Sequence, residues 1–290
     1  MYNRGVVTGI RRQDQKVDAL VQGVRVAADY NGQQMPWPLC EAWFAQYAPG
    51  FWYCLGPIGN RELVLHDDFL QVTTPNGDTP WTLRTSGAGG SLAASTALGV
   101  GVARVRKTAG AGVAFIHKDT DAISVPSGRN ALWLSTRFRY TPDASTWFTG
   151  VSANDPPFLY ACGASSDVTA TTPGGGIHFG VALENATTQF RLGSYVEGTI
   201  AAVDTWYVAD LLVWSGTVDG TAGNITVGWV DGNGPAGVRR MESGAITPLF
   251  GVYNDVTSDV GIDGHIDWFH IERVTLAPLA VESGDGITFP

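Results

Sequence analysis

Two aspartates on a predicted C-terminal strand come nearest in this sequence to the spacing of a catalytic pair. Asp263 and Asp267 stand four residues apart, so a strand would place both carboxylates on one face. Two carboxylates that flank the scissile bond are what a glycoside hydrolase requires. Here the residue between them on that face is His265, and the segment contains no glutamate. We therefore expect no catalytic residues and a protein that is not an enzyme.

A second group of residues combines aromatic rings with amide and carboxylate side chains at the predicted ends of strands. An aromatic ring that stacks on a sugar, with polar groups beside it for the hydroxyls, is suited to carbohydrate binding. Packing in the core is the alternative for each ring, because aromatic side chains dominate protein cores. The residues that we predict to bind carbohydrate are Trp147, Asn154, Asp155, Tyr160, Tyr253 and Asn254.

Calcium is the one cofactor that the sequence suggests. Loop aspartates and asparagines supply the oxygen ligands that calcium prefers, and Asp255 and Asp259 are the expected ligands. The alternative is a turn, because Asn and Asp side chains bond their own backbone. The five histidines show no zinc-protease spacing, so we expect no zinc.

Composition and charge exclude several classes of protein. The chain has 290 residues, of which 44% are hydrophobic and only 16% charged. Low charge with many aromatic rings argues against disorder and against a helical bundle. The formal net charge of −9 argues against a nucleic-acid partner. No apolar run is long enough to span a membrane as a helix, and no membrane partner is expected.

Short β-rich segments separated by Gly, Pro, Asn and Asp recur along the whole chain and predict an all-β fold. Five predicted strands fall within the first sixty residues and suggest a small closed barrel of the OB type. Residues 39–47 could instead form one short helix. The barrel strands are predicted at 4–12, 16–22, 24–30, 39–47 and 51–57. Later strands are predicted at 101–107, 112–117, 131–140, 145–152, 176–183, 188–195, 205–215, 223–230, 246–253 and 262–275.

The sequence suggests two domains, a barrel over residues 1–62 and a two-layered jelly-roll sandwich over residues 63–290. Residues 58–68 change in character and form the predicted junction. The formal charge changes there as well, from +1 in the first part to −10 in the second. The small-residue stretch 86–101 is either a flexible linker or an ordered part of the sandwich, and we favour the second reading.

The cysteines and the N-terminus bear on where the chain folds. Three widely spaced cysteines, Cys40, Cys54 and Cys162, suit a reducing cytoplasm better than a disulfide framework. We expect Cys40 and Cys54 to be buried thiols. Residues 1–10 lack the charged start and apolar core of a signal peptide.

The tryptophans divide into two predicted groups. Those in the interiors of sandwich strands should pack in the core. The barrel has more large rings than so small a unit can bury, so we expect part of its surface to meet another chain. Trp37, Trp43 and Trp52 form the predicted docking face, with the barrel core as their alternative location. The predicted core tryptophans are Trp206, Trp214, Trp229 and Trp268.

Several aromatic and glycine placements resemble a known family. The strand after Trp206, the segment Ile225–Gly232 and the closing segments Phe250–Tyr253 and Gly264–Phe269 are similar to concanavalin A-like or laminin-G-like jelly rolls. The segment Phe51–Gly56 resembles a strand of the small barrels in tail and baseplate proteins of tailed bacteriophages.

This resemblance implies a structural protein of a bacteriophage particle, made in the host cytoplasm. The barrel would dock on other virion proteins, with the chain as a homo-oligomer, and the jelly roll would bind a glycan on the host surface. A minor tail or fibre protein is the first interpretation, and a capsid decoration or head-fibre protein is the alternative. A polysaccharide hydrolase of the laminarinase-like class is the further alternative.

Overall fold

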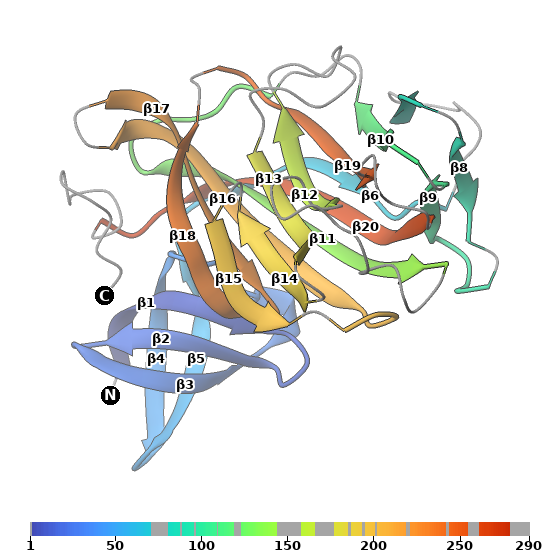
Figure 1. Ribbon diagram of the computed structural model, residues 1–290. Helices are drawn as coiled ribbons and strands as arrows, with labels where there is room; N and C mark the ends of the chain where they lie inside the picture. Colours follow the sequence, from blue (N-terminus) through green and yellow to red (C-terminus); the bar gives the residue numbers. More distant parts are fainter. Residues whose placement is uncertain are drawn as a thin grey trace.

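The computed structural model has a small barrel below a large β-sandwich (Figure 1). It describes residues 2–70, residues 81–143 apart from 88, 96, 109 and 119–122, and residues 158–278 apart from seven gaps. Those gaps are 166–176, 185–186, 193–194, 201, 219–220, 242–243 and 255–260. Within these residues the only helical segment between strands is the short 3-10 turn η1 (Gly32–Gln34). No helix among them is long and apolar enough to cross a membrane.

Five strands close the N-terminal barrel. In spatial order they are β1 (Tyr2–Arg11), β2 (Lys16–Val21), β3 (Val24–Tyr30), β5 (Phe51–Ile58) and β4 (Glu41–Ala48). All neighbours run antiparallel except β3 and β5, which are parallel. This confirms the small barrel expected from the sequence and shows that residues 39–47 contribute a strand instead of a helix.

Strand alternation explains how the barrel acquires its interior. On β2, Val17, Ala19 and Val21 are buried while the residues between them are partly exposed. Side chains of a strand point alternately to its two faces, so a period of two directs one set inward.

The rest of the chain forms two stacked antiparallel sheets. The first has the strand order β15 (Tyr195–Ile200), β14 (Thr187–Leu192), β13 (Ile177–Glu184), β12 (Phe158–Ser165), β19 (Thr247–Asn254), β10 (Gly112–Lys118) and β7 (Trp81–Thr85). The second has the order β18 (Asn233–Met241), β17 (Thr221–Val230), β16 (Tyr207–Val218), β11 (Asn130–Pro142), β20 (Ile262–Thr275), β9 (Ala103–Lys107) and β8 (Gly90–Ala94), and β6 (Arg61–Asp67) also pairs with β20. An all-β fold with a barrel and a jelly-roll-type sandwich is therefore confirmed.

The predicted junction differs from the sequence-based expectation, whereas the stretch 86–101 agrees with the favoured reading. The junction predicted at 58–68 is largely the strand β6, which pairs with β20 along Arg61–Asp67. The stretch 86–101 contains the strand β8, so it is part of the sandwich. The strand predicted at 145–152 lies outside the described residues.

The second sheet buries both of its faces. On β16, Leu211 and Val213 belong to the cluster between the two sheets, whereas Leu212 and Trp214 belong to a cluster on the outer face. Strands that are covered on both sides have near-continuous apolar sequences. The run Leu211–Trp214 is such a sequence, and the barrel is what covers the outer face.

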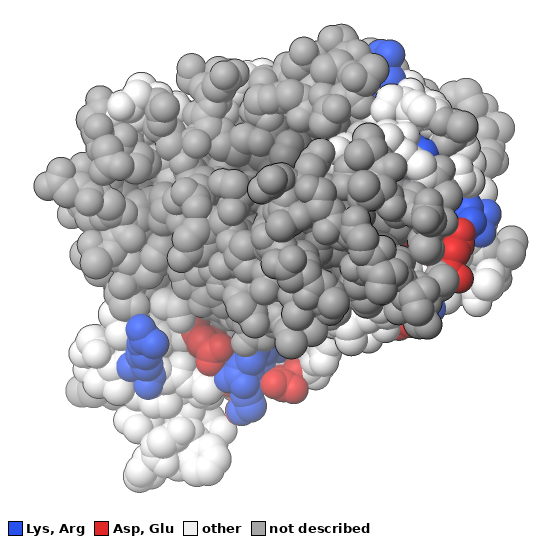
Figure 2. Space-filling model, in the orientation of Figure 1, with Lys and Arg blue, Asp and Glu red and all other residues white. Residues whose placement is uncertain are grey.

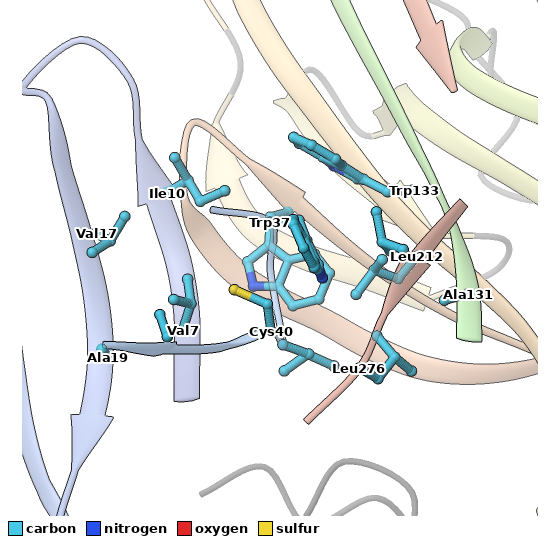
Figure 3. Close-up of a cluster of buried hydrophobic side chains, with 14 of the residues drawn as sticks. Val7, Ile10, Val17, Ala19, Trp37, Cys40, Ala131, Trp133, Leu212 and Leu276 are labelled. Carbon is cyan, nitrogen blue, oxygen red and sulfur yellow. The ribbon is translucent and has the colours of Figure 1, made fainter. Parts of the chain in front are cut away.

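The interior of the barrel and the outer face of the sheet form a single hydrophobic cluster (Figure 3). Trp37 lies between the two parts, fully buried, and its indole Nε1 donates to the carbonyl oxygen of Thr275 over 2.8 Å. Trp133 and Leu212 face it from the sandwich. The barrel therefore does not pack independently of the sandwich, although the domain boundary at residue 62 stays a prediction.

A buried ion pair reinforces this contact. The guanidinium of Arg12, on the β1–β2 turn, donates to both carboxylate oxygens of Asp210 on β16, over 2.6 and 2.7 Å. Asp210 also accepts from Trp133 Nε1 and Ser135 Oγ. Burial lowers the pKa of Arg12, but the pair with Asp210 raises it more, so the pKa lies above its ordinary value. Asp210 is the one acidic residue in the apolar run of β16.

The predicted state of the first two cysteines is confirmed. Cys40 and Cys54 are buried free thiols in the barrel. Burial raises the pKa of Cys54 to about 11 and raises that of Cys40 well above its ordinary value. Thiols this protonated are poor nucleophiles, so both residues act in packing.

Candidate functional site

The tip of the barrel carries exposed aromatic rings. Tyr47 and Phe51 flank the turn between β4 and β5, and they are 61% and 59% exposed. Their ring centroids are 5.9 Å apart. The β4–β5 hairpin points away from the sandwich (Figure 1), and its extreme lower end shows no charged residue on the face seen in Figure 2. One ion pair lies beside it, because the Tyr47 hydroxyl donates to Asp29 Oδ2 over 3.4 Å and Asp29 pairs with Lys16. Large exposed rings are typical of a surface that meets another protein.

The three tryptophans of the predicted docking face have different environments. The prediction for Trp37 is wrong, because Trp37 is completely buried against this chain's own sandwich and is not part of an external face. Trp52 is partly buried and packs against the same cluster. Trp43, on β4, is 38% exposed and is the one that keeps a large accessible surface.

Trp43 lines a groove at the base of the barrel, at the opposite end of the β4–β5 hairpin from the tip. The groove has a volume of about 420 Å³. Its polar lining comes from η1 and from the start of β6, and its apolar lining from β4, β5 and Met35. The lining residues are Gln33, Gln34, Met35, Trp43, Leu55, Gly56, Pro57 and Arg61.

The positive charge of Arg61 in this groove is balanced by the buried carboxylate of Glu272. Its Nε donates to Glu272 Oε1 over 2.7 Å, and Glu272 is almost completely buried. His270 Nε2 lies 2.9 Å from the same oxygen. Burial raises the pKa of Glu272, but the bonds from His270 and Arg61 lower it more, so the carboxylate stays charged at neutral pH. The groove is thus polar without an excess of positive charge.

The structure places the two C-terminal aspartates on the outer face of the second sheet, beyond the barrel. Asp263 accepts from Arg106 Nη1 at both oxygens, over 3.0 and 3.1 Å, and Asp267 pairs with Arg137. Each carboxylate is therefore engaged by an arginine. A bulge opposite Arg137 and Phe138 also breaks the regular alternation between them.

Between those aspartates, His265 lies in a cross-strand row with two arginines. Its register partners are Arg104 on β9 and Arg139 on β11. His265 is 6% exposed, and its Nδ1 has no hydrogen-bond partner among the described residues. Burial, together with the neighbouring arginines, lowers its pKa to about 4, although Asp263 acts in the opposite direction. The imidazole is consequently neutral at physiological pH.

Half of the six predicted carbohydrate-binding residues fall outside the described part of the chain. This is true of Trp147, Asn154 and Asp155. Tyr160 lies on β12, and Tyr253 and Asn254 lie on the neighbouring strand β19. The ladder pairs Tyr160 with Gly251 and Phe158 with Tyr253, so the backbone brings the two tyrosine positions close together. Tyr253 is partly buried and packs against Val113, Phe115 and Leu249.

The predicted calcium ligands, Asp255 and Asp259, also lie outside the described residues, and calcium stays a prediction. Among the residues that are described, no group of three or more His, Cys, Asp or Glu side chains is arranged to hold a metal ion.

Comparisons with known proteins identify no family for this chain. No protein-family model matches the chain, and no curated protein is significantly similar to it. Among solved structures, a sialidase matches 91% of this chain at 10% identity and a TM-score of 0.43, but this chain spans only 21% of that protein. The match to the carbohydrate recognition domain of Emp47p covers 74% of this chain and 97% of that domain's chain, at 11% identity and a TM-score of 0.40. The match to a carbohydrate esterase of Shiga toxin-encoding bacteriophage phi24B covers 67% of this chain and 90% of that protein, at 14% identity and a TM-score of 0.37.

A Lotus tetragonolobus seed lectin is also among the solved structures that resemble this chain, at 7% identity and a TM-score of 0.37. The same comparisons correct one expectation. The sequence led us to expect that the protein is not an enzyme, but the solved structures that resemble this chain include a sialidase and a carbohydrate esterase. The lack of a recognisable catalytic motif therefore does not exclude enzymatic activity.

Sequence reasoning missed several residues of the barrel surface. Tyr47 and Phe51 flank the Ala-Pro-Gly turn, which is recognisable from sequence, and aromatic residues beside a tight turn are a usable signal of an exposed tip. No comparable sequence pattern indicates that Gln33, Gln34 and Arg61 lie on one surface. They come together because η1 and β6, which are distant along the chain, meet beside β4 and β5.

Proposed function

We propose that this chain is a structural protein of a bacteriophage particle that docks through the tip of its barrel and presents the lectin-like sandwich to carbohydrate on the host surface. The observation that carries the proposal is the pair of exposed aromatic rings of Tyr47 and Phe51 at the tip of the barrel, directed away from the sandwich (Figure 1). A minor tail or fibre protein is the form that we favour.

The firm attachment of barrel to sandwich supports this arrangement. The shared cluster around Trp37 and the ion pair of Arg12 with Asp210 connect the two parts through both apolar and polar contacts. An adaptor that fixes the barrel to a particle would then also hold the sandwich in a defined direction. Symmetric assembly of several copies through the barrel is part of the proposal, because a ring or trimer brings equivalent apolar patches together.

The test is incorporation of a tip variant into particles of the source virus. Phe51→Asp adds a charge to the exposed tip without disturbing the buried cluster, so it should fold normally and be depleted from purified particles at least tenfold. Leu63→Asp is the matched control, because Leu63 is 59% exposed on β6 and lies outside the tip. Quantitative mass spectrometry of purified particles measures both.

Two outcomes would contradict the proposal. One is the absence of the wild-type chain from purified particles. The other is incorporation of Phe51→Asp at the wild-type level.

A further inference from the structure

We propose that the groove at the base of the barrel binds an uncharged saccharide, at a site separate from the loops of the sandwich. This goes beyond the proposed function, which assigns carbohydrate binding to the sandwich and docking to the tip. The groove combines three features that sugar recognition needs: an accessible aromatic ring, amide groups carried on a fixed turn and a balanced charge. Its volume of about 420 Å³ lies in the range typical of small-ligand sites.

The aromatic ring is that of Trp43. It is 38% exposed, although it lies on a strand of a closed barrel. The guanidinium of Arg4, its cross-strand partner on β1, lies 4.9 Å from the ring centroid. Arg4 therefore supports the indole, while the part of the side chain that lines the groove stays accessible. An indole held in this way offers a flat apolar surface to the C–H groups of a pyranose.

The amides come from Gln33 and Gln34 in η1. The turn is fixed by Asn31, whose side-chain oxygen accepts from the backbone N–H of Gln33 and whose carbonyl accepts from that of Gln34. Gly56 leaves room for Gln34, because a Cβ at that position would lie 2.9 Å from Gln34 Oε1. Each amide carries both donors and an acceptor, which is the combination that a sugar hydroxyl uses.

The charge distinguishes an uncharged saccharide from an acidic one. Arg61 is the only charged residue among those lining the groove, and its guanidinium is already bound to Glu272 and to the carbonyl oxygen of Met35. An anion would have to compete with the buried Glu272 carboxylate for that guanidinium. A sugar hydroxyl could instead accept a hydrogen bond from an N–H group of Arg61 that is not already bound to Glu272 or Met35.

The experiment titrates the full chain with uncharged and acidic oligosaccharides. Cellohexaose, maltohexaose and chitohexaose are the uncharged probes, hexagalacturonate is the acidic one, and each is taken to about 10 mM because single-site affinities of open grooves are weak. Isothermal titration calorimetry gives the affinity. Chemical-shift changes of the indole N–H resonances, assigned by the loss of one resonance in Trp43→Ala, give the location.

The variants are chosen so that misfolding and loss of the site give different results. Trp43→Ala should weaken binding of at least one uncharged probe tenfold or more. The double variant Gln33→Ala/Gln34→Ala, at exposed positions, should weaken the same probe several-fold with an unchanged unfolding transition. Phe51→Ala is the matched control, because it removes an even more exposed aromatic ring that lies outside the groove, and it should bind as the wild type does.

Three results would overturn the inference. They are no binding of any uncharged probe, binding that Trp43→Ala leaves unchanged, and binding of hexagalacturonate alone. Because none of these measurements involves the particle, they are independent of the docking function. Loss of Trp43→Ala from particles without any sugar binding would instead make Trp43 part of the docking face.

Discussion

At the scale of single residues, the contact between Arg12 and Asp210 is the strongest determinant of how barrel and sandwich fit together. Asp210 is 1% exposed and has Arg12 as its charged partner. Removing one member of a buried pair leaves the other charge uncompensated. Surface pairs, by contrast, contribute little.

We therefore expect Arg12→Ala to lower the free energy of unfolding by about 3–5 kcal/mol. The adjacent Arg11 pairs with Asp18, where both side chains are substantially exposed, so Arg11→Ala should cost less than about 1 kcal/mol. Urea unfolding of the two variants measures the difference. Equal effects at the two positions would show that the buried pair does not hold the interface.

His265 gives a pH-dependent prediction at the same scale. Burial lowers its pKa from the ordinary value of 6.5 to about 4. As pH falls from 6.5 towards 4, the unfolded chain takes up a proton at this position and the folded chain does not, so stability decreases across that window. With allowance for partial solvent screening, we expect a contribution of about 1–3 kcal/mol.

The measurement is the free energy of unfolding at several pH values between about 7 and 4. His265→Gln keeps a polar side chain without a titrating group, so its stability should fall less steeply than that of the wild type. Parallel curves for the two proteins would argue against a buried, neutral imidazole.

The sequence alone predicted which residues of β20 share a face, but it did not predict which side chains lie opposite them. The face shared by Asp263 and His265 follows from strand periodicity, and the sequence allowed it to be predicted. The arginines that oppose them come from β9 and β11. Their pairing depends on which strands are neighbours, and no local pattern specifies that.

At the scale of elements, the turn between β17 and β18 and the strand β1 approach each other unusually closely. A Cβ on Gly9 would lie 2.5 Å from the carbonyl oxygen of Gly232. Next to this contact, Trp229 Nε1 donates to the carbonyl oxygen of Thr8 over 2.8 Å. Glycine is required because the two backbones leave no space for a side chain.

Gly9→Ala should consequently destabilise the protein by about 1–3 kcal/mol, as overpacking of a close contact does. Gly32→Ala is the control, because nothing lies within 4 Å of a Cβ at that position, and it should change stability by less than about 0.5 kcal/mol. Thermal unfolding of both variants decides. A neutral effect of Gly9→Ala would mean that the barrel and the β17–β18 turn are further apart than described.

The strands whose sequences alternate or are continuously apolar could be predicted, and β16 and β20 are examples. β6 was not predicted, because its apolar residues Leu63, Val64 and Leu65 are consecutive and do not alternate with polar ones, although Val64 and Leu65 pack against the cluster between the sheets. It forms because β20 is long enough to pair with β9 at one end and with β6 at the other.

At the scale of the whole molecule, the barrel is both a cap on the sandwich and a projection from it. One end shares a hydrophobic cluster with the second sheet, and the other end exposes Tyr47 and Phe51. The sequence predicted two parts and an excess of aromatic rings in the first. It could not reveal that Trp37 turns inward and satisfies part of that excess within this chain.

Cryo-electron microscopy of purified particles of the proposed bacteriophage tests the docking account most directly, because it shows location and orientation together. The account predicts copies of this chain with the barrel tip buried against a neighbouring protein and the sandwich facing the solvent. Particles in which the barrel tip points outward, or in which the chain is missing, would contradict it.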